Sequence, residues 1–117
     1  MKAYYLSTCS TCKRILGEIQ LPENAILIDI KKNPVTASQL EEMHSLTNSY
    51  EALFNKRAQL YRKRALNTKK LSETDYKNLL LEHYSFLKRP VFVENDKIFV
   101  GNAKSTIQKL KAYLNDQ

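Results

Sequence analysis

The chain has two cysteines, Cys9 and Cys12, separated by two residues in the segment STCSTCKRIL. Two thiols at this spacing can form a reversible disulfide, in which one thiolate attacks a partner and the other thiol resolves the mixed disulfide. They can also supply half of a zinc site, or act as small apolar residues in a core. The chemistry therefore depends on the local structure that positions the two sulfur atoms.

The residues around the cysteines predict a strand followed directly by a helix. The aromatic segment 2–7 favours a strand, and segment 10–20 places its apolar side chains on one helical face. Cys9 is then expected where the helix begins, beside backbone N–H groups and the positive end of the helix dipole, which lower the pKa of a thiol. Cys12, one turn further along and more buried, is expected to be the resolving thiol.

Lys13 and Arg14 follow Cys12 directly and are predicted to add positive charge near a Cys9 thiolate. A metal site is not expected, because zinc would need two further ligands and the available histidines, His44 and His83, have no paired spacing. The structural alternative stays open, since a small residue at position 12 also suits a helix face that packs in a core. The position at a strand-to-helix junction favours redox chemistry.

Length and composition predict one soluble domain over residues 1–117. The chain of 13.6 kDa is 43% hydrophobic and 26% charged, with a net charge of +7 that favours an anionic partner. No apolar run approaches the ~20 residues that a membrane span needs, and the N-terminus turns polar too early for a signal peptide. A cytoplasmic location is therefore expected, and a permanent disulfide is not.

The rest of the sequence predicts a second strand and a closing hairpin. The apolar run 25–30 favours a buried parallel strand, and segments 91–94 and 97–100 alternate around Asn95-Asp96 as a two-residue hairpin does. A final helix carries Ile107, Leu110 and Leu114 inward. The order β-α-β, then β-β-α, predicts a thioredoxin-like α/β fold: a four-stranded mixed sheet flanked by helices.

A helical insertion over about 36–84 is predicted between these two halves. Thr36 with Gln39, and Ser72 with Asp75, have the spacing of capping boxes, which start helices. A short helix is predicted over 49–56. The basic segment 57–71 is predicted to be a loop with one helical turn.

Arg89 and Pro90 immediately precede the predicted hairpin. In a thioredoxin-like fold this position holds a cis-proline that faces the cysteine motif, and Pro90 is predicted to be that residue. Arg89 is then placed to direct its guanidinium, which binds oxyanions through a planar fork, toward an anion beside Cys9.

At this point the sequence resembles the arsenate reductase-like (ArsC/Spx) family of thioredoxin-fold proteins. The resemblance covers nearly the whole chain and rests on YLSTCSTCKRIL and on LKRPVFVENDKIFVGNAKSTI. It implies that Cys9 is the working cysteine, that Cys12 matches the second cysteine of the Spx-like branch, and that Arg89 contacts the oxyanion. It also implies glutathione with glutaredoxin, or thioredoxin, as an external reductant, with no bound cofactor.

The sequence departs from the family's reductases at two positions around the anion. Glu51 stands near the place of a second arginine, with Arg57 close by in sequence, and after the hairpin Lys104 is the nearest cation. One arginine of three is thus present, so a tight arsenate pocket is not expected. The expected substrate is a small oxyanion, or a protein or glutathione disulfide. A redox partner protein is also expected.

Two other functions are weighed against this enzyme. A redox-sensing regulator resembling Spx would bind the RNA polymerase α-subunit, with the Cys9–Cys12 disulfide as its switch. Direct nucleic-acid binding through the basic segment 56–70, which includes Tyr61, is not favoured, because a charge run is usually a solvated face and no recognition motif accompanies it.

Overall fold

The computed structural model describes residues 1–116, which divide into two compact units. The first unit joins Met1–Asn33 to Arg89–Gln117, and the second is Pro34–Lys88. The first unit contains four strands and two helices: β1 (Lys2–Tyr5), α1 (Ser10–Glu18), β2 (Ile26–Asp29), β3 (Val91–Glu94), β4 (Lys97–Val100) and α5 (Lys104–Asn115). The second unit is helical: α2 (Ala37–Thr47), η1 (Glu51–Leu53), α3 (Gln59–Lys63), η2 (Leu66–Thr68), α4 (Glu73–Glu82) and η3 (Tyr84–Phe86).

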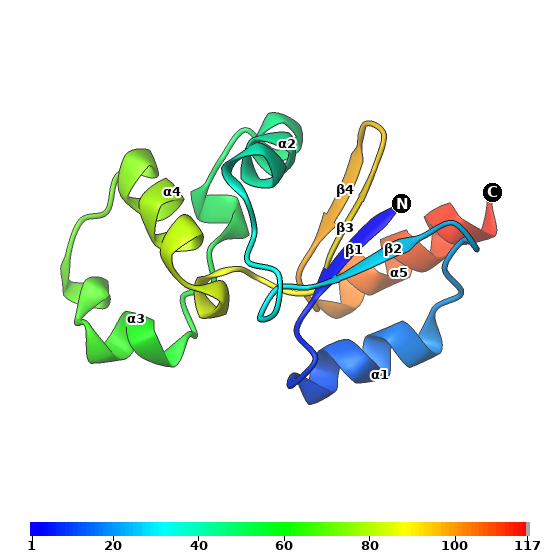
Figure 1. Ribbon diagram of the computed structural model, residues 1–117, viewed down its shortest axis with the longest axis horizontal. Coiled ribbons are helices and arrows are strands. Elements are labelled where there is room, and N and C mark those ends of the chain that lie inside the picture. The colour runs from blue at the N-terminus through cyan, green and yellow to red at the C-terminus, as the bar shows by residue number, and fades with distance from the viewer. Residues whose placement is uncertain (117) are drawn as a thin grey trace. The chain divides into compact units, whose positions relative to one another are not determined.

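The sheet of the first unit has the order β2-β1-β3-β4 (Figure 1). β1 pairs with β2 in parallel and with β3 in antiparallel, and β3 pairs with β4 in antiparallel. The mixed four-stranded sheet and the α/β fold class predicted from the sequence are therefore confirmed. The register sets Tyr5 opposite Asp29, so β1 and β2 end at the same edge of the sheet.

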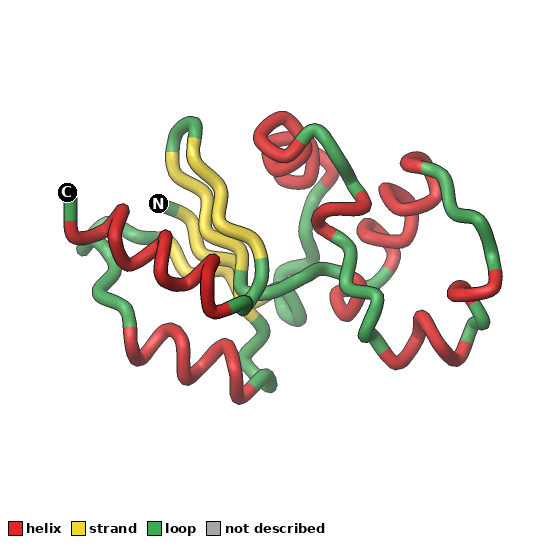
Figure 2. The backbone as a smooth tube through the Cα atoms, turned by 180° about the vertical axis from the view of Figure 1, so that it is seen from behind, coloured by secondary structure: helices red, strands yellow, loops and turns green. Residues whose placement is uncertain are grey.

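One face of this sheet carries the core of the first unit. Ala3 of β1 lies opposite Phe92 of β3, and both are buried in an apolar cluster with residues of α1 and α5. Figure 2 shows these two helices alongside the yellow strands. The buried members of the cluster are Ala3, Ile15, Ile19, Phe92, Ile107 and Leu110. α1 is thus packed against β1 and β3 through Ile15.

The prediction that the apolar run 25–30 is a buried strand is wrong for its first half. Ile26 and Leu27 are 57% and 53% exposed, whereas Asp29 and Ile30 are buried. A continuous apolar run usually indicates a strand covered on both faces, but β2 is an edge strand of this sheet. Only its carboxyl end lies inside the protein.

The predicted hairpin is present, and its turn uses left-handed backbone. Asn95 has a φ of 53°, which asparagine tolerates better than most residues, between Glu94 and Lys97 of the paired strands. After β4, Gly101 has a φ of 87°, where a side chain would be strained. Its N–H donates to the Pro90 carbonyl at 2.9 Å, which joins the end of the hairpin to its beginning.

Both predicted capping boxes are present in the second unit. Thr36 Oγ1 accepts the Gln39 N–H at 3.1 Å and starts α2, and Ser72 Oγ accepts the Asp75 N–H at 3.1 Å and starts α4. The reciprocal bonds to the capping residues' own N–H groups are also made. Local hydrogen bonding therefore decides where these helices begin.

The helix predicted over 49–56 is reduced to the single 3-10 turn η1. The carboxylate of Glu73, in the first turn of α4, accepts the N–H groups of Tyr50 at 2.8 Å and Glu51 at 3.1 Å. The N–H groups at the start of η1 thus find their acceptor in a residue more than twenty positions away. Local periodicity cannot reveal such a partner. The basic segment 57–71 contains α3 and η2, slightly more helix than the one turn predicted.

Replacing Ser72 with alanine is expected to lower the free energy of unfolding by about 1 kcal/mol, because the Asp75 N–H loses its acceptor at the start of α4. Urea denaturation followed by circular dichroism measures the change. Ser45→Ala is the matched control, since Ser45 lies within α2 and bonds back to the Glu42 carbonyl without capping the helix. Equal midpoints for the two variants would contradict the prediction.

Candidate functional site

A tight turn places Cys9 at the N-terminus of α1. The chain leaves β1 at Tyr5 and turns through Ser7 and Thr8, and the Cys9 N–H donates to the Leu6 carbonyl at 3.0 Å. These four residues, 6–9, are called the Leu6–Cys9 turn below. Cys9 is half-buried and has extended backbone (φ −94°, ψ 112°), as an N-cap residue has.

Cys12 lies one turn into α1 and is fully buried, at 0% exposure. Both thiols are reduced. The pKa of the Cys12 thiol is raised to about 11. Burial, a hydrogen bond with the Cys9 thiol and the charge of Cys9 raise it, against the lowering effects of a backbone hydrogen bond with Leu6 and of the Arg89 charge. Cys12 is therefore a neutral thiol at physiological pH.

The Cys9 thiol is perturbed in the opposite direction. Partial burial would raise its pKa, but the N–H and thiol of Cys12, the positive charge of Arg89 and the N–H of Thr11 together lower the pKa. These groups are the first N–H groups of a helix, one neighbouring thiol that donates, and one guanidinium. The two cysteines of the pair are thus separated in acidity, with the more exposed sulfur as the more acidic one.

Arg89 and Pro90 reach the same site from the other half of the sequence. The Arg89–Pro90 peptide bond is cis, Pro90 is buried, and β3 begins directly after it. The half-buried Arg89 acts electrostatically on Cys9 and Cys12. All four residues belong to the first unit, so one compact body holds the pair and its cation.

Lys13 and Arg14, predicted to supply charge to the pair, are both exposed on α1. The Arg14 guanidinium pairs with Glu18 at 3.0 Å, on the same helix, and Lys111 of α5 lies 3.7 Å from the same carboxyl group. Among the groups that perturb the pKa of Cys9, the charged one is Arg89. The structure thus brings Arg89, Cys9 and Cys12 together and directs Arg14 to Glu18.

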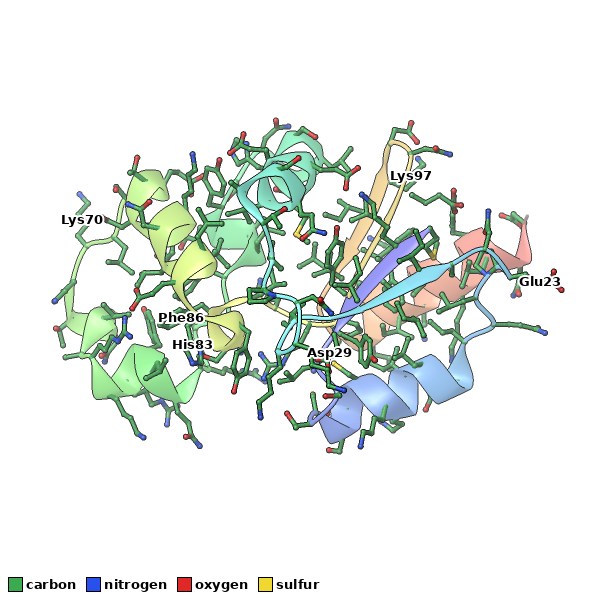
Figure 3. All side chains as sticks on the ribbon, viewed as in Figure 1. Glu23, Asp29, Lys70, His83, Phe86 and Lys97 are labelled. Atoms are coloured by element: carbon green, nitrogen blue, oxygen red, sulfur yellow. The ribbon has the colours of Figure 1, made fainter. Side chains whose placement is uncertain are left out.

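Sequence reasoning missed Asp29, which lies at the carboxyl end of β2 (Figure 3). It is 7% exposed, and its carboxylate accepts the N–H of Ser7 in the Leu6–Cys9 turn at 3.3 Å. The available signal was an acidic residue that ends an apolar strand at the edge where the parallel neighbour β1 also ends. That edge of an α/β sheet is where functional loops gather.

The remaining candidates have structural partners within the second unit. Glu51 pairs with Lys56 at 2.6 Å and accepts from the Tyr76 hydroxyl at 3.4 Å. His44 stacks on the ring of Tyr50, with ring centroids 4.0 Å apart. Within residues 1–116, no three His, Cys, Asp or Glu side chains come together in a way that could hold a metal ion.

His83 and two cations of the basic segment 56–70 also have partners within the second unit. The His83 Nδ1 atom lies 2.8 Å from the Ser85 hydroxyl oxygen. In the segment, Lys56 pairs with Glu51, and Arg64 pairs with Glu82 at 2.7 Å. Arg57 is exposed, as is Lys104 at the start of α5. Over residues 1–116, no helix has both the length and the apolar character needed to cross a membrane.

The mixed sheet, the cysteine pair at the start of α1 and the cis-proline before β3 define a thioredoxin-like α/β protein. More specifically, residues 4–110 match the ArsC family, and the chain belongs to that family.

Similar proteins agree with this assignment. A structure described as a possible arsenate reductase from Streptococcus mutans is 32% identical, covers 93% of this chain and 95% of its own, and superposes with a TM-score of 0.74. A Staphylococcus aureus protein solved by NMR is 28% identical, covers 92% of this chain and 95% of its own, and gives 0.72. The global transcriptional regulator Spx 2 of Bacillus anthracis is 24% identical over 110 residues, which are 91% of this chain and 82% of that protein.

Proposed function

We propose that this protein is a cytoplasmic thiol–disulfide oxidoreductase, with Cys9 as the attacking thiolate and Cys12 as the resolving thiol. The observation that carries the proposal is the placement of the two sulfur atoms: Cys9 is half-buried at the N-terminus of α1, and Cys12 is fully buried one turn further along. The pKa of Cys9 is accordingly lowered, and that of Cys12 is raised to about 11. An attacking sulfur must be ionised and accessible, whereas a resolving sulfur must stay protonated until a mixed disulfide has formed.

The reaction proceeds by two displacements at sulfur. The Cys9 thiolate attacks one sulfur of a protein or glutathione disulfide, so that a Cys9–substrate disulfide forms and the other substrate sulfur leaves as a thiolate. Cys12 then gives up its proton to solvent and attacks the Cys9 sulfur, which releases the second substrate thiolate. The substrate has gained two electrons, and the Cys9–Cys12 disulfide that remains is reduced by glutathione with glutaredoxin, or by thioredoxin.

Arg89 is proposed to stabilise negative charge on the substrate or on the departing thiolate. Its guanidinium charge already acts on Cys9, and a planar fork of N–H donors suits carboxylate and oxyanion groups. Near the place where the family's reductases have a second arginine, this chain has Glu51, which pairs with Lys56 and Tyr76 and supplies no cation for an oxyanion. A disulfide substrate, which needs one anion-stabilising cation, is therefore favoured over arsenate.

The test measures reactivity and turnover in the same preparation. Iodoacetamide is expected to modify Cys9 alone at pH 7, because Cys12 stays buried and protonated until the pH approaches its pKa of about 11, as peptide mass spectrometry will show. Reduction of oxidised glutathione is then followed with thioredoxin, and reduction of arsenate with each reductant. Equal labelling of both thiols, or no turnover of either substrate with any reductant, would refute the proposal that the protein is an oxidoreductase.

The similarity to Spx 2 of Bacillus anthracis supports a second function, redox-sensitive transcriptional regulation. Here the Cys9–Cys12 disulfide would be a switch that controls binding to the α-subunit of RNA polymerase, rather than an intermediate in turnover. A pull-down with the carboxyl-terminal domain of that polymerase subunit, using reduced and oxidised protein, separates the two functions. Binding that depends on the disulfide, without turnover, would favour the regulator.

A further inference from the structure

We propose that Asp29 is a positioning residue of the thiol site: its carboxylate holds the Leu6–Cys9 turn and thereby keeps the Cys9 sulfur at the N-terminus of α1. This inference deepens the proposed function and rests on it.

One backbone hydrogen bond closes the turn that carries Cys9. Its closing bond, from the Cys9 N–H to the Leu6 carbonyl, fixes the ends of the turn but leaves Ser7 and Thr8 between them. Asp29 supplies the missing constraint, because its Oδ1 atom accepts the Ser7 N–H at 3.3 Å and its carboxylate also accepts the Ser7 hydroxyl. Ser7 is thus bound through both its main chain and its side chain.

Asp29 is itself held firmly. It pairs with Tyr5 in the parallel ladder, and its Oδ1 atom accepts the Lys31 N–H at 3.2 Å. Its own carbonyl accepts the N–H groups of Lys32 at 3.1 Å and Asn33 at 2.8 Å. A buried carboxylate at 7% exposure needs hydrogen-bond donors to stay ionised. The N–H groups of Ser7 and Lys31 are two such donors, and through them Asp29 joins the loops that follow β1 and β2.

The hydrogen bonds to Ser7 are the largest influence that lowers the pKa of Asp29, assisted by the Lys31 N–H and the charge of Lys32, so Asp29 is an anion at neutral pH. An anion near the site would by charge alone oppose a Cys9 thiolate. The groups that act on Cys9 are instead Cys12, Thr11 and Arg89. Asp29 therefore acts through geometry, since it sets where the Cys9 sulfur lies relative to those donors.

The two mechanisms predict opposite signs when Asp29 is replaced by alanine, which removes both the charge and the acceptor of the Ser7 N–H. Loss of a negative charge would lower the pKa of Cys9, because the thiolate is repelled less. Loss of positioning raises the pKa, because the sulfur moves away from the N–H groups of α1 and from Arg89. We expect the rise, measured from thiolate ultraviolet absorbance against pH, to be accompanied by about threefold slower alkylation below the pKa.

Ser7→Ala removes the hydroxyl partner and leaves the Asp29 charge in place, so it should shift the pKa of Cys9 in the same direction. Added to Asp29→Ala, it should have little further effect, because both changes act on the same contact. Ser105→Ala, an exposed serine of α5, is the matched control and should leave the titration unchanged. Circular dichroism checks the fold, and if Asp29→Ala does not fold, Ser7→Ala decides alone.

An unchanged or lowered Cys9 pKa in the folded variants, with a low pKa in the original protein, would overturn the positioning role while the proposed function stands. An ordinary Cys9 pKa of about 8.5 in the original protein would instead overturn the proposed function itself. The two failures are therefore distinguishable in one titration series.

Discussion

Replacing Cys9 with serine is expected to lower turnover of a disulfide substrate by more than about a thousandfold, because a serine hydroxyl is not ionised at neutral pH and cannot attack sulfur. The half-buried position of Cys9 at the start of α1 makes it the sulfur that a substrate meets first. Steady-state reduction of oxidised glutathione, coupled to NADPH through thioredoxin and thioredoxin reductase and corrected for the rate without the protein, measures the loss.

Cys12→Ser is the informative partner of this variant, because it leaves the attacking thiolate in place. The mixed disulfide between Cys9 and the substrate should then accumulate and appear in intact-protein mass spectrometry as an added glutathione. Cys9→Ser should show no such adduct, since Cys12 is buried and protonated. An adduct on Cys12 in the Cys9→Ser protein would reverse the assigned roles.

Replacing Arg89 with glutamine is expected to slow alkylation of Cys9 by neutral iodoacetamide about tenfold at pH 6, because loss of a nearby opposite charge raises the thiol pKa. The sign follows from the titration: a pKa lowered by Arg89 keeps the thiolate present at acidic pH, and a raised one removes it there. Above the pKa of both proteins the rates should converge. A complete pH–rate profile measures both limits.

The charged reagent iodoacetate separates the two roles of Arg89. A guanidinium that also attracts anions should favour iodoacetate over iodoacetamide, and this preference should fall in Arg89→Gln at every pH. Lys109→Gln is the matched control, because Lys109 is an exposed cation of α5 in the same unit. Equal effects of the two substitutions would mean that overall charge, rather than Arg89, governs the site.

The sequence and the structure give Arg14 different partners. The spacing of Arg14 from Cys9 predicted a contribution to the thiolate, but spacing along a helix does not show the direction of a long side chain, and Arg14 pairs with Glu18. Arg89 could be inferred because the proline that follows it occupies the cis-proline position of a thioredoxin-like fold, which faces the cysteine motif. Asp29 could not, because its contact with Ser7 depends on the register between β1 and β2.

The elements themselves were predictable where local hydrogen bonds decide them. The capping boxes at Thr36 and Ser72 set helix starts from residues three positions apart, and the hairpin turn at Asn95 is set by backbone preference. The prediction was wrong at Ile26 and Leu27, because exposure depends on the position of β2 in the strand order. Strand order is a property of the whole sheet, which a window of sequence does not contain.

The first unit is assembled from two ends of the chain, and this has a consequence for its biosynthesis. Both cysteines emerge from the ribosome long before Arg89 and the strands β3 and β4, and β1 cannot complete its pairing until β3 has been translated. The nascent polypeptide therefore lacks the Arg89 charge beside Cys9, and this contribution to the acidity of Cys9 arises only when the last quarter of the protein docks. The Cys9 thiol therefore reaches its full acidity only when folding is complete.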